Sequence, residues 1–272
     1  MKKKVIFLDI DGTLIGYDGK MPESTKGAIR QAVANGHHLV ICSGRSKFQV
    51  DPSFFELGFQ GVVGAAGAYV EINGTEIYHS YIEELQRKFL CEYLESNGFI
   101  YCMQADHGIV INESSKAGMI QIFSGMGISE KRLNRLIGNM EVREDVWNHP
   151  KEEKALFFNS PFSLEKVNAD IAPYFTAISS SMQKKENKSG EIGIAGINKA
   201  TGMQIYLDHL GIAKEDTIAI GDGPNDMEMI AYAEVGIAMG NAHSLLKEIA
   251  DITTREIDRD GIKHAFEVLG II

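Results

Sequence analysis

The sequence has few cysteines and no long apolar run. Its 272 residues include three cysteines, which lie far apart and form no C-x-x-C pair: Cys42, Cys91 and Cys102. Such scarcity argues against a disulfide framework and a structural zinc site. No stretch approaches the roughly 18 consecutive apolar residues of a membrane helix, and the four apolar residues before Asp9 are too few for a signal peptide. We therefore expect a soluble protein of the reducing cytoplasm.

Positive charge is also scarce. The chain has 27 lysines and arginines against 37 acidic residues, which gives a formal net charge of −10. This balance disfavours nucleic acid as a partner, because nucleic-acid binding relies on basic surface. It leaves a small phosphorylated molecule open, since a site can hold its own cation. The apolar content of 44% is enough for a packed core in one large domain or two modest ones.

Short apolar runs alternate with helical segments near both ends of the chain. We predict buried parallel strands in three such runs, residues 5–8, 39–42 and 217–220. A hairpin at Asn73-Gly74 predicts a returning strand over 75–82. This alternation is typical of an α/β fold with a Rossmann-like, doubly wound parallel sheet. We assign residues 1–82 and 190–272 to this discontinuous core domain.

The middle of the chain, residues 83–189, has a different order of expected helices and strands from the two ends. Helices are expected over 84–97, 130–140 and 164–171, and strands over 99–103, 108–112, 154–159 and 175–180. These elements predict an α+β insert, with one sheet and helices on a face, that forms a cap domain. The polar run 183–191 is interpreted as the linker that returns to the core.

Two carboxylates, Asp9 and Asp11, follow the first apolar run. Alternate residues of a strand share a face, and open α/β sheets bind ligands at the carboxyl ends of their strands. Two close anions repel each other unless a cation or a shared proton offsets them, so the spacing indicates a metal site, an acid/base pair, or both. A calcium loop starting at Asp9 does not fit, because its sixth and twelfth places hold Leu14 and Lys20 instead of glycine and glutamate.

Other polar residues stand where further strands end. Ser43-Gly44 follows the second strand, and Asp222, Asn225 and Asp226 follow a later one. Such hard oxygen ligands suit Mg²⁺, although Asn225 or Asp226 could instead cap the next helix. Lys199 begins a helix, where the helix dipole prefers an anion, so it indicates a bound anion nearby. A lysine in a solvated first turn is the alternative.

Together these segments resemble the motifs of the haloacid dehalogenase (HAD) superfamily, in order and over the whole chain. The resemblance rests on Asp9-Ile10-Asp11-Gly12-Thr13, Ser43-Gly44-Arg45, Lys199 and Gly221-Asp222-Gly223-Pro224-Asn225-Asp226. The size and position of the insert, with Ala238–Ala242 and Asp260-Gly261, resemble the Cof-type subgroup with a type IIB cap. Its members are mostly Mg²⁺-dependent sugar-phosphate and cofactor phosphatases. One departure is Ala66-Gly67-Ala68, where the subgroup often has Asn-Gly-Ala.

The resemblance implies a role for each motif residue. Asp9 would be the nucleophile that forms an aspartyl-phosphate. Asp11 would protonate the leaving oxygen and later activate water. Lys199 would neutralise Asp9 and the transferring phosphoryl group. Mg²⁺ would lie between Asp9, the backbone carbonyl of Asp11, and Asp222, with Asp226 binding directly or through water.

The remaining motif residues would contact the substrate. Ser43 would donate a hydrogen bond to a phosphoryl oxygen, and backbone N–H groups near Gly12 and Gly44 would cradle the phosphate. The turn alone would also explain Gly12. Asn225 would orient Lys199 or contact the phosphate. For Arg45, a substrate contact and a salt bridge beside the second motif are equally open.

These assignments predict a Mg²⁺-dependent phosphatase of a small phosphorylated metabolite, either a sugar phosphate or a phosphorylated cofactor. A cap that closes over the substrate would exclude water and set specificity. Two alternatives remain, a phosphomutase of sugar phosphates and a non-catalytic sensor of a phosphorylated ligand. A mutase would also keep Asp11, whereas a sensor needs no general acid. No nucleic acid or membrane partner is expected, and no pattern indicates an oligomer.

Overall fold

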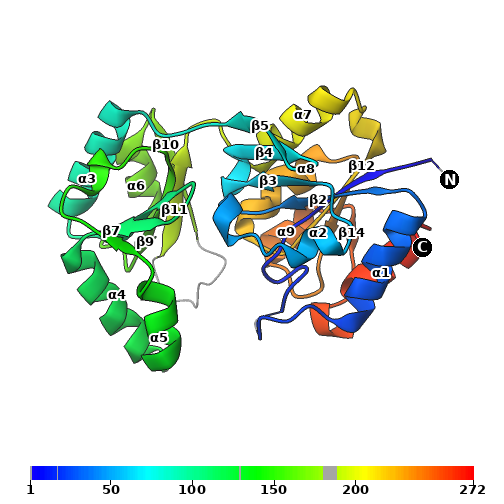
Figure 1. The fold of residues 1–272 in the computed structure, drawn as a ribbon, viewed down its shortest axis with the longest axis horizontal. Coiled ribbons are helices and arrows are strands. Elements are labelled where there is room, and N and C mark those ends of the chain that lie inside the picture. The colour runs from blue at the N-terminus through cyan, green and yellow to red at the C-terminus, as the bar shows by residue number, and fades with distance from the viewer. Residues whose placement is uncertain (1, 17, 129, 180–188) are drawn as a thin grey trace. The chain divides into compact units, whose positions relative to one another are not determined.

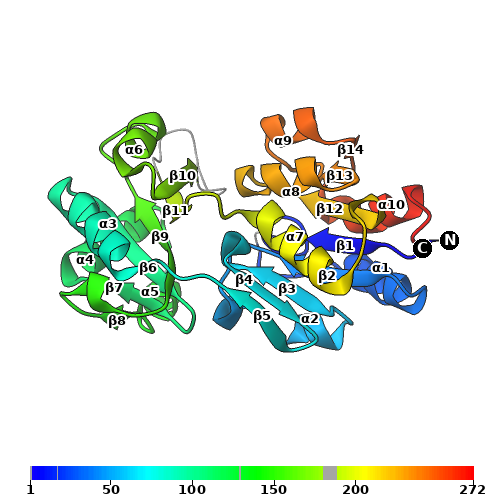
Figure 2. The ribbon, with the colours of Figure 1, turned by 90° about the horizontal axis from the view of Figure 1, so that it is seen from above.

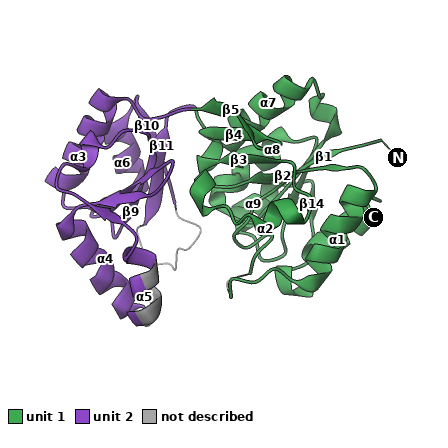
Figure 3. Ribbon diagram, in the orientation of Figure 1, with its two compact units in different colours: residues 1–79, 197–272 green, residues 80–196 purple. Residues whose placement is uncertain are grey.

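The chain folds into two compact units. The computed structural model describes residues 2–16, 18–128, 130–179 and 189–272. The core unit comprises residues 1–79 and 197–272, and the inserted unit comprises residues 80–196 (Figure 3). The sequence puts these boundaries at 82/83 and 189/190.

An eight-stranded sheet forms the centre of the core unit. Its spatial order is β14-β13-β12-β1-β2-β3-β4-β5, parallel from β14 to β3 and antiparallel over the last two strands. The strands are β1 (Val5–Leu8), β2 (His38–Cys42), β3 (Gly61–Gly64), β4 (Tyr69–Ile72), β5 (Thr75–His79), β12 (Thr217–Gly221), β13 (Val235–Ala238) and β14 (Ile252–Thr253). This topology confirms the predicted α/β fold with a parallel sheet.

Helices cover both faces of that sheet, and α7 and α1 lie on opposite sides of it in Figure 1. The core helices are α1 (Glu23–Ala34), α2 (Ser53–Glu56), α7 (Lys199–Leu210), α8 (Met227–Tyr232), α9 (Ser244–Ile249) and α10 (Gly261–Val268). The α1 helix buries an apolar stripe that includes Ala28, Ile29 and Ala32. The α7 helix ends at Gly211, which adopts the left-handed conformation that favours glycine.

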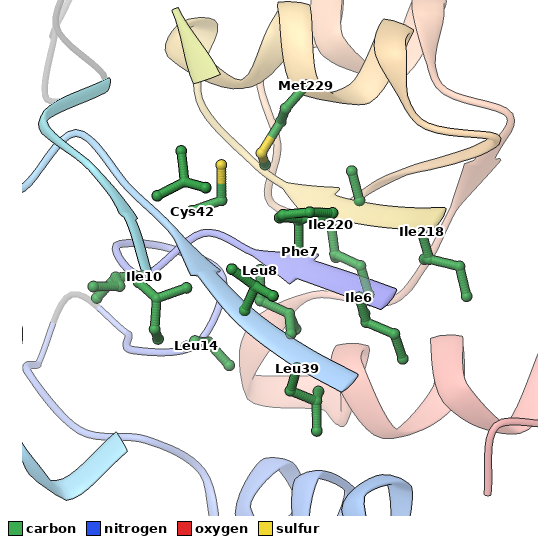
Figure 4. Packing of buried hydrophobic residues seen from close by; sticks show 14 of the residues in the cluster. Ile6, Phe7, Leu8, Ile10, Leu14, Leu39, Cys42, Ile218, Ile220 and Met229 are labelled. Carbon is green, nitrogen blue, oxygen red and sulfur yellow. The ribbon is translucent and has the colours of Figure 1, made fainter. Parts of the chain in front are cut away.

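The central strands are buried on both faces. All four residues of β1 are buried, and Figure 4 shows Ile6, Phe7 and Leu8 packed among side chains of the neighbouring strands. A parallel strand that is covered on both faces must be apolar throughout. The uninterrupted apolar runs therefore mark these strands and fix where each of them ends.

The inserted unit contains a second sheet, with the order β10-β11-β9-β6-β7-β8 (Figure 2). Its pairs are antiparallel except for β7 with β8. Its elements are α3 (Glu84–Ser96), β6 (Ile100–Ala105), β7 (Ile109–Ile111), α4 (Glu113–Gly125), α5 (Glu130–Ile137), β8 (Glu141–Val142), β9 (Glu152–Phe158), α6 (Leu164–Ile171), β10 (Phe175–Ser179) and β11 (Gly190–Ile194). The predicted α+β insert is confirmed. Within the described part of the chain, no helix combines the length and apolarity needed to cross a bilayer.

Several predicted elements need correction. The α4 helix and the strands β8 and β11 are absent from the prediction. Residues 190–191 are not linker, because β11 pairs with β9 and β10 and so extends the inserted unit to Gly196. The strand predicted to end at 82 ends at His79, since Ile82 already donates its N–H to Glu152 of the inserted unit. Residues 180–188, which include most of the predicted linker, lie outside the described part.

Short 3₁₀ turns complete the chain. They are η1 (Lys47–Gln49), η2 (Ala65–Gly67), η3 (Val146–Asn148), η4 (Lys214–Asp216), η5 (Pro224–Asp226) and η6 (Ile257–Arg259). Three of them, η1, η2 and η5, follow the carboxyl ends of the parallel strands β2, β3 and β12. They belong to the sheet edge where the polar motif residues gather.

Candidate active site

The motif residues follow three adjacent parallel strands. Asp9 follows β1, Ser43 follows β2 and Asp222 follows β12, and β1 pairs with both of the other strands. The N–H of Asp9 donates to the carbonyl of Ile220 at 3.0 Å, which extends the β1–β12 pairing to this point. Parallel strands end at one edge of a sheet, so the topology brings these three residues to the edge where open α/β sheets generally bind ligands.

Lys199 connects two of the acidic residues. Its Nζ donates to Oδ1 of Asp9 at 2.7 Å and to Oδ1 of Asp226 at 2.5 Å. The residue is 1% exposed, so the alternative of a lysine in a solvated first turn is wrong. Burial alone would lower the pKa of the Lys199 ammonium, but the charges of Asp226 and Asp9 outweigh it and raise that pKa. Lys199 is therefore a permanent buried cation.

Asp226 is saturated with hydrogen bonds. Besides Lys199 at Oδ1, its Oδ2 accepts the backbone N–H groups of Asp222 at 2.9 Å and Gly223 at 2.8 Å. Asp226 therefore does not cap the next helix, α8, to which its side chain makes no capping hydrogen bond. Its carboxylate instead closes the turn η5 onto its own start. The same carboxylate also holds Lys199 in place.

Three buried carboxylates lie close together. Asp9, Asp222 and Asp226 each offer an oxygen, and these oxygens lie within 4.8 Å of one another. Burial raises the pKa of Asp9 to about 7, although Lys199 opposes the shift. Burial, and then the charges of Asp9 and Asp226, raise the pKa of Asp222 to about 8. A divalent cation fits this group, because it would offset the clustered charge and it prefers hard oxygen donors.

Gly12 is required by the shape of the turn at this edge. Its φ is +87°, and a Cβ at this position would lie 2.1 Å from Oδ2 of Asp222. Sequence reasoning assigned no contact to Thr13 or Asn241, yet both support this turn. Thr13 donates its hydroxyl to Oδ1 of Asp222 at 3.2 Å, and Nδ2 of Asn241 donates to the carbonyl of Gly12 at 2.8 Å. The sequence signals for Asn241 are its place after a buried strand and its membership of the segment Ala238–Ala242, which resembles the Cof-type subgroup.

Asp11 lies apart from the three-acid cluster. Its carboxylate is exposed and accepts two hydrogen bonds from Arg45, from Nε at 2.8 Å and from Nη2 at 2.6 Å. Of the two interpretations of Arg45, the structure shows the salt bridge. The two carboxylates of the Asp9-x-Asp11 pair thus have different environments, one buried beside a lysine and one exposed beside an arginine.

The remaining predicted residues line the same edge. Oγ of Ser43 accepts the N–H of Arg45 at 3.2 Å, and Gly44 lies between these two residues. Asn225 is half-buried, and its side chain makes no hydrogen bond within the described ranges. Gly67 belongs to the Ala-Gly-Ala segment that differs from the usual Asn-Gly-Ala of the subgroup. A Cβ on Gly67 would lie 2.0 Å from the carbonyl of Asn198. This segment therefore packs directly against the start of α7, which carries Lys199.

Comparisons with known proteins agree with this geometry. The family model described as haloacid dehalogenase-like hydrolase matches residues 6–266. The chain is 32% identical to "Putative phosphatase YkrA" of Bacillus subtilis (strain 168), over the full length of both. It is 28% identical to "5-amino-6-(5-phospho-D-ribitylamino)uracil phosphatase YitU" of the same organism, covering 96% of this chain and 95% of that protein.

A solved structure gives a similar result. The HAD subclass IIB sugar phosphatase BT4131 is 25% identical in sequence and superimposes with a TM-score of 0.82. The match covers 99% of this chain and 100% of that structure. The likeness therefore includes the core unit and the inserted unit alike.

Proposed function

Because the chain belongs to the haloacid dehalogenase-like hydrolase family, we propose that it hydrolyses a phosphate monoester in two steps, with Asp9 as nucleophile and Mg²⁺ as cofactor. That it is a phosphatase of small phosphorylated substrates follows from its relatives and its structural neighbours. The observation that carries the finer proposal is the buried Lys199 ammonium. It bonds Asp9 and Asp226 at the same sheet edge as Asp222.

Asp9 is suited to nucleophilic attack. One of its oxygens is bonded to Lys199, and the other accepts no hydrogen bond in the described part of the chain. In the first step that oxygen attacks phosphorus, a phosphorus–oxygen bond to Asp9 forms, and the bond to the leaving alkoxide breaks. Lys199 stabilises the transition state because its charge lies beside the developing negative charge.

Asp11 is suited to proton transfer because it stays outside the carboxylate cluster. In the first step it would act in its protonated form, with a proton taken up from solvent, and give that proton to the leaving alkoxide. In the second step it would take a proton from water, which attacks phosphorus and releases inorganic phosphate and free Asp9. Arg45 holds the Asp11 carboxylate through two hydrogen bonds, so the Asp11 side chain is oriented before a substrate arrives.

The cation site would use Asp9, Asp222 and the backbone carbonyl of Asp11. When bound there, Mg²⁺ supplies positive charge that offsets the charge of the phosphate. Asp226 adds its charge to the site while its oxygens stay bonded to Lys199 and the turn. Ser43 and Asn225, with backbone N–H groups near Gly12 and Gly44, would contact the phosphoryl oxygens.

We assign substrate selection to the inserted unit, which would act as a cap. The name of YitU describes a phosphatase of a phosphorylated ribityl compound, and BT4131 is described as a sugar phosphatase. These names support a small phosphorylated substrate of the proposed kind, a sugar phosphate or a phosphorylated cofactor. The acidic chain, which has three buried free cysteines, suits the reducing cytoplasm.

The proposal is tested by measuring phosphate release from a panel of phosphorylated metabolites at fixed Mg²⁺, ranked by kcat/KM. We expect release from several sugar phosphates, loss of activity with EDTA, and no activity in Asp9→Asn. A phosphomutase would interconvert isomers and release little phosphate. A sensor would bind ligand and release none. Full activity in EDTA would exclude the role of the metal.

A further inference from the structure

The inserted unit contains a second group of metal-ligating side chains, formed by His107, Glu141 and His149. His107 lies in the turn between β6 and β7, Glu141 begins β8, and His149 follows η3. One ligand atom from each lies within 4.8 Å of the others. The two imidazole rings face each other with centroids 5.1 Å apart and planes inclined by 37°. Three separate segments of the unit therefore converge on one point.

We propose that these three residues bind a divalent transition-metal cation, Zn²⁺ in the first instance. Two imidazoles and one carboxylate form a mixed nitrogen and oxygen donor set, which suits Zn²⁺ and disfavours Mg²⁺ and Ca²⁺. Three protein ligands leave a fourth position for water. This site differs in ligand chemistry from the oxygen-only cluster of Asp9, Asp222 and Asp226.

The distances are compatible with a shared cation. Nε2 of His149 lies 3.8 Å from Oε2 of Glu141, while two ligands of one tetrahedral Zn²⁺ lie about 3.3 Å apart. The side chains of His107 and Glu141 are 63% and 52% exposed, so they can close the remaining gap without disturbing the core. His149 is 5% exposed and supplies the fixed side of the site.

The Nδ1 atoms of the two imidazoles have different surroundings. The carboxylate of Asp106 accepts a hydrogen bond from Nδ1 of His107, an arrangement that commonly orients a metal-bound histidine and leaves its Nε2 for the metal. Nδ1 of His149 is buried and has no hydrogen-bond partner within the described ranges. Burial also lowers the pKa of His149, which favours the neutral, metal-binding form. Within the described ranges, no hydrogen bond at Nδ1 therefore holds His149 in its buried position, and its Nε2 is the atom that faces Glu141.

Neighbouring cations leave the ligand atoms of this site available. Arg143 lies 3.4 Å from Oε1 of Glu141, and the Oε2 atom is the one that faces His149. Lys151 lies 3.3 Å from Oδ2 of Asp106, whereas Oδ1 binds His107. Each carboxylate therefore pairs with a cationic side chain through one oxygen and turns the other toward the histidines.

The test is calorimetric titration of the full, untagged chain with Zn²⁺ in a buffer containing excess Mg²⁺, which fills the oxygen-only cluster. We expect one Zn²⁺ per chain. The variants His107→Ala and Glu141→Gln, both at exposed side chains, should bind Zn²⁺ at least about 10-fold more weakly, and Asp106→Asn about 10- to 100-fold more weakly. The control His209→Ala removes an exposed histidine from α7 and should bind Zn²⁺ like the parent chain.

The result has two readings only. Zn²⁺ binding that is weakened by the site variants and unchanged in the control supports the site. No Zn²⁺ uptake in excess Mg²⁺, or equal affinity in the parent chain, His107→Ala and Glu141→Gln, overturns it. Phosphatase activity does not enter this test, so its outcome is independent of the proposed function.

Discussion

Nζ of Lys199 lies 2.7 Å from Oδ1 of Asp9, although the two residues are 190 positions apart in the sequence. Both side chains are almost fully buried, and the same ammonium also bonds Asp226. Removing one partner of a buried ion pair lowers the stability of the fold. The first segment of the core unit, which carries Asp9, and the second, which carries Lys199, therefore stabilise each other at this contact. The contact links the folding of the core unit to the chemistry we assign to Asp9.

Replacing Lys199 by methionine should impair both stability and activity. Two buried carboxylates would lose their counter-charge, which costs about 3–5 kcal/mol in the free energy of unfolding. The loss of transition-state stabilisation should lower kcat by about 10²–10³-fold. Denaturant unfolding and phosphate release measure the two effects. Lys263→Met, at an exposed lysine of α10, is the control and should change stability by less than about 0.5 kcal/mol. A Lys199→Met variant with parental kcat would contradict the assigned role.

Replacing Asp11 by asparagine should separate activity from stability. The Asp11 carboxylate is 56% exposed, and its only ion pair is with Arg45 within the part of the chain described. An exposed pair contributes about 0–1 kcal/mol, so the melting temperature should change little. Hydrolysis of an alkyl phosphate should fall by about 10²–10⁴-fold, because the leaving alkoxide would lack its proton donor. Loss of stability in proportion to activity would instead indicate a structural role.

Gly12→Ala should disrupt the site far more than Gly19→Ala. Both glycines have a positive φ, +87° and +80°, which costs an alanine about 1–2 kcal/mol. A Cβ on Gly12 would also lie 2.1 Å from Oδ2 of Asp222, whereas a Cβ on Gly19 meets no atom of the described residues within 4 Å. We expect Gly12→Ala to lose most activity and Mg²⁺ binding, and Gly19→Ala to keep both. Equal behaviour of the two variants would show that the turn, and not the contact with Asp222, requires glycine.

Glu152 should make the stability of the inserted unit depend on pH. Burial raises its pKa to about 8, and neither carboxylate oxygen has a hydrogen-bond partner within the described ranges. Between its unfolded pKa near 4.5 and about 8, the folded chain holds a proton that the unfolded chain releases. The stabilisation by this proton is therefore complete below pH 4.5 and is lost as the pH rises to 8, at up to about 1.4 kcal/mol per pH unit.

Glu152→Gln isolates this effect, because the amide stays neutral at every pH. Thermal unfolding at pH 6 and pH 9, at fixed Mg²⁺, should show a smaller decrease for Glu152→Gln than for the parent chain. Glu83→Gln, at a neighbouring exposed acid, should follow the parent chain. An unchanged pH dependence in Glu152→Gln would mean that the Glu152 carboxyl does not titrate in this range.

The sequence predicts the core unit better than the inserted unit, for a physical reason. Strands β1 and β12 are buried on both faces, so their apolar runs are unbroken and their ends point to Asp9 and Asp222. The strand β11 contains Gly190 and Gly193, and only two of its five residues are buried, so it has no unbroken apolar run. The α4 helix was missed because Ser114, Ser115 and Gly118 dilute its apolar pattern.

The sequence predicts the residues of the site that stand at the ends of strands and helices, but not the contacts between distant segments. The acids and Lys199 stand at strand and helix ends that the sequence reveals. The pairing of Arg45 with Asp11 and the support of Gly12 by Asn241 join segments 34 and 229 residues apart, and no local pattern reports such contacts. The cluster of His107, Glu141 and His149 was missed for the same reason, since the spacing of its members follows no metal-binding motif.

The central claim is that Asp9 is phosphorylated, and trapping that intermediate tests it most directly. Asp11→Asn should be mixed with p-nitrophenyl phosphate and Mg²⁺, because this leaving group needs little protonation while the second step still needs Asp11 as base. Acid quenching and peptide mass spectrometry should then find one phosphoryl group on Asp9. The double variant with Asp9→Asn should carry none. Phosphate on another residue, or turnover that survives Asp9→Asn, would contradict the account.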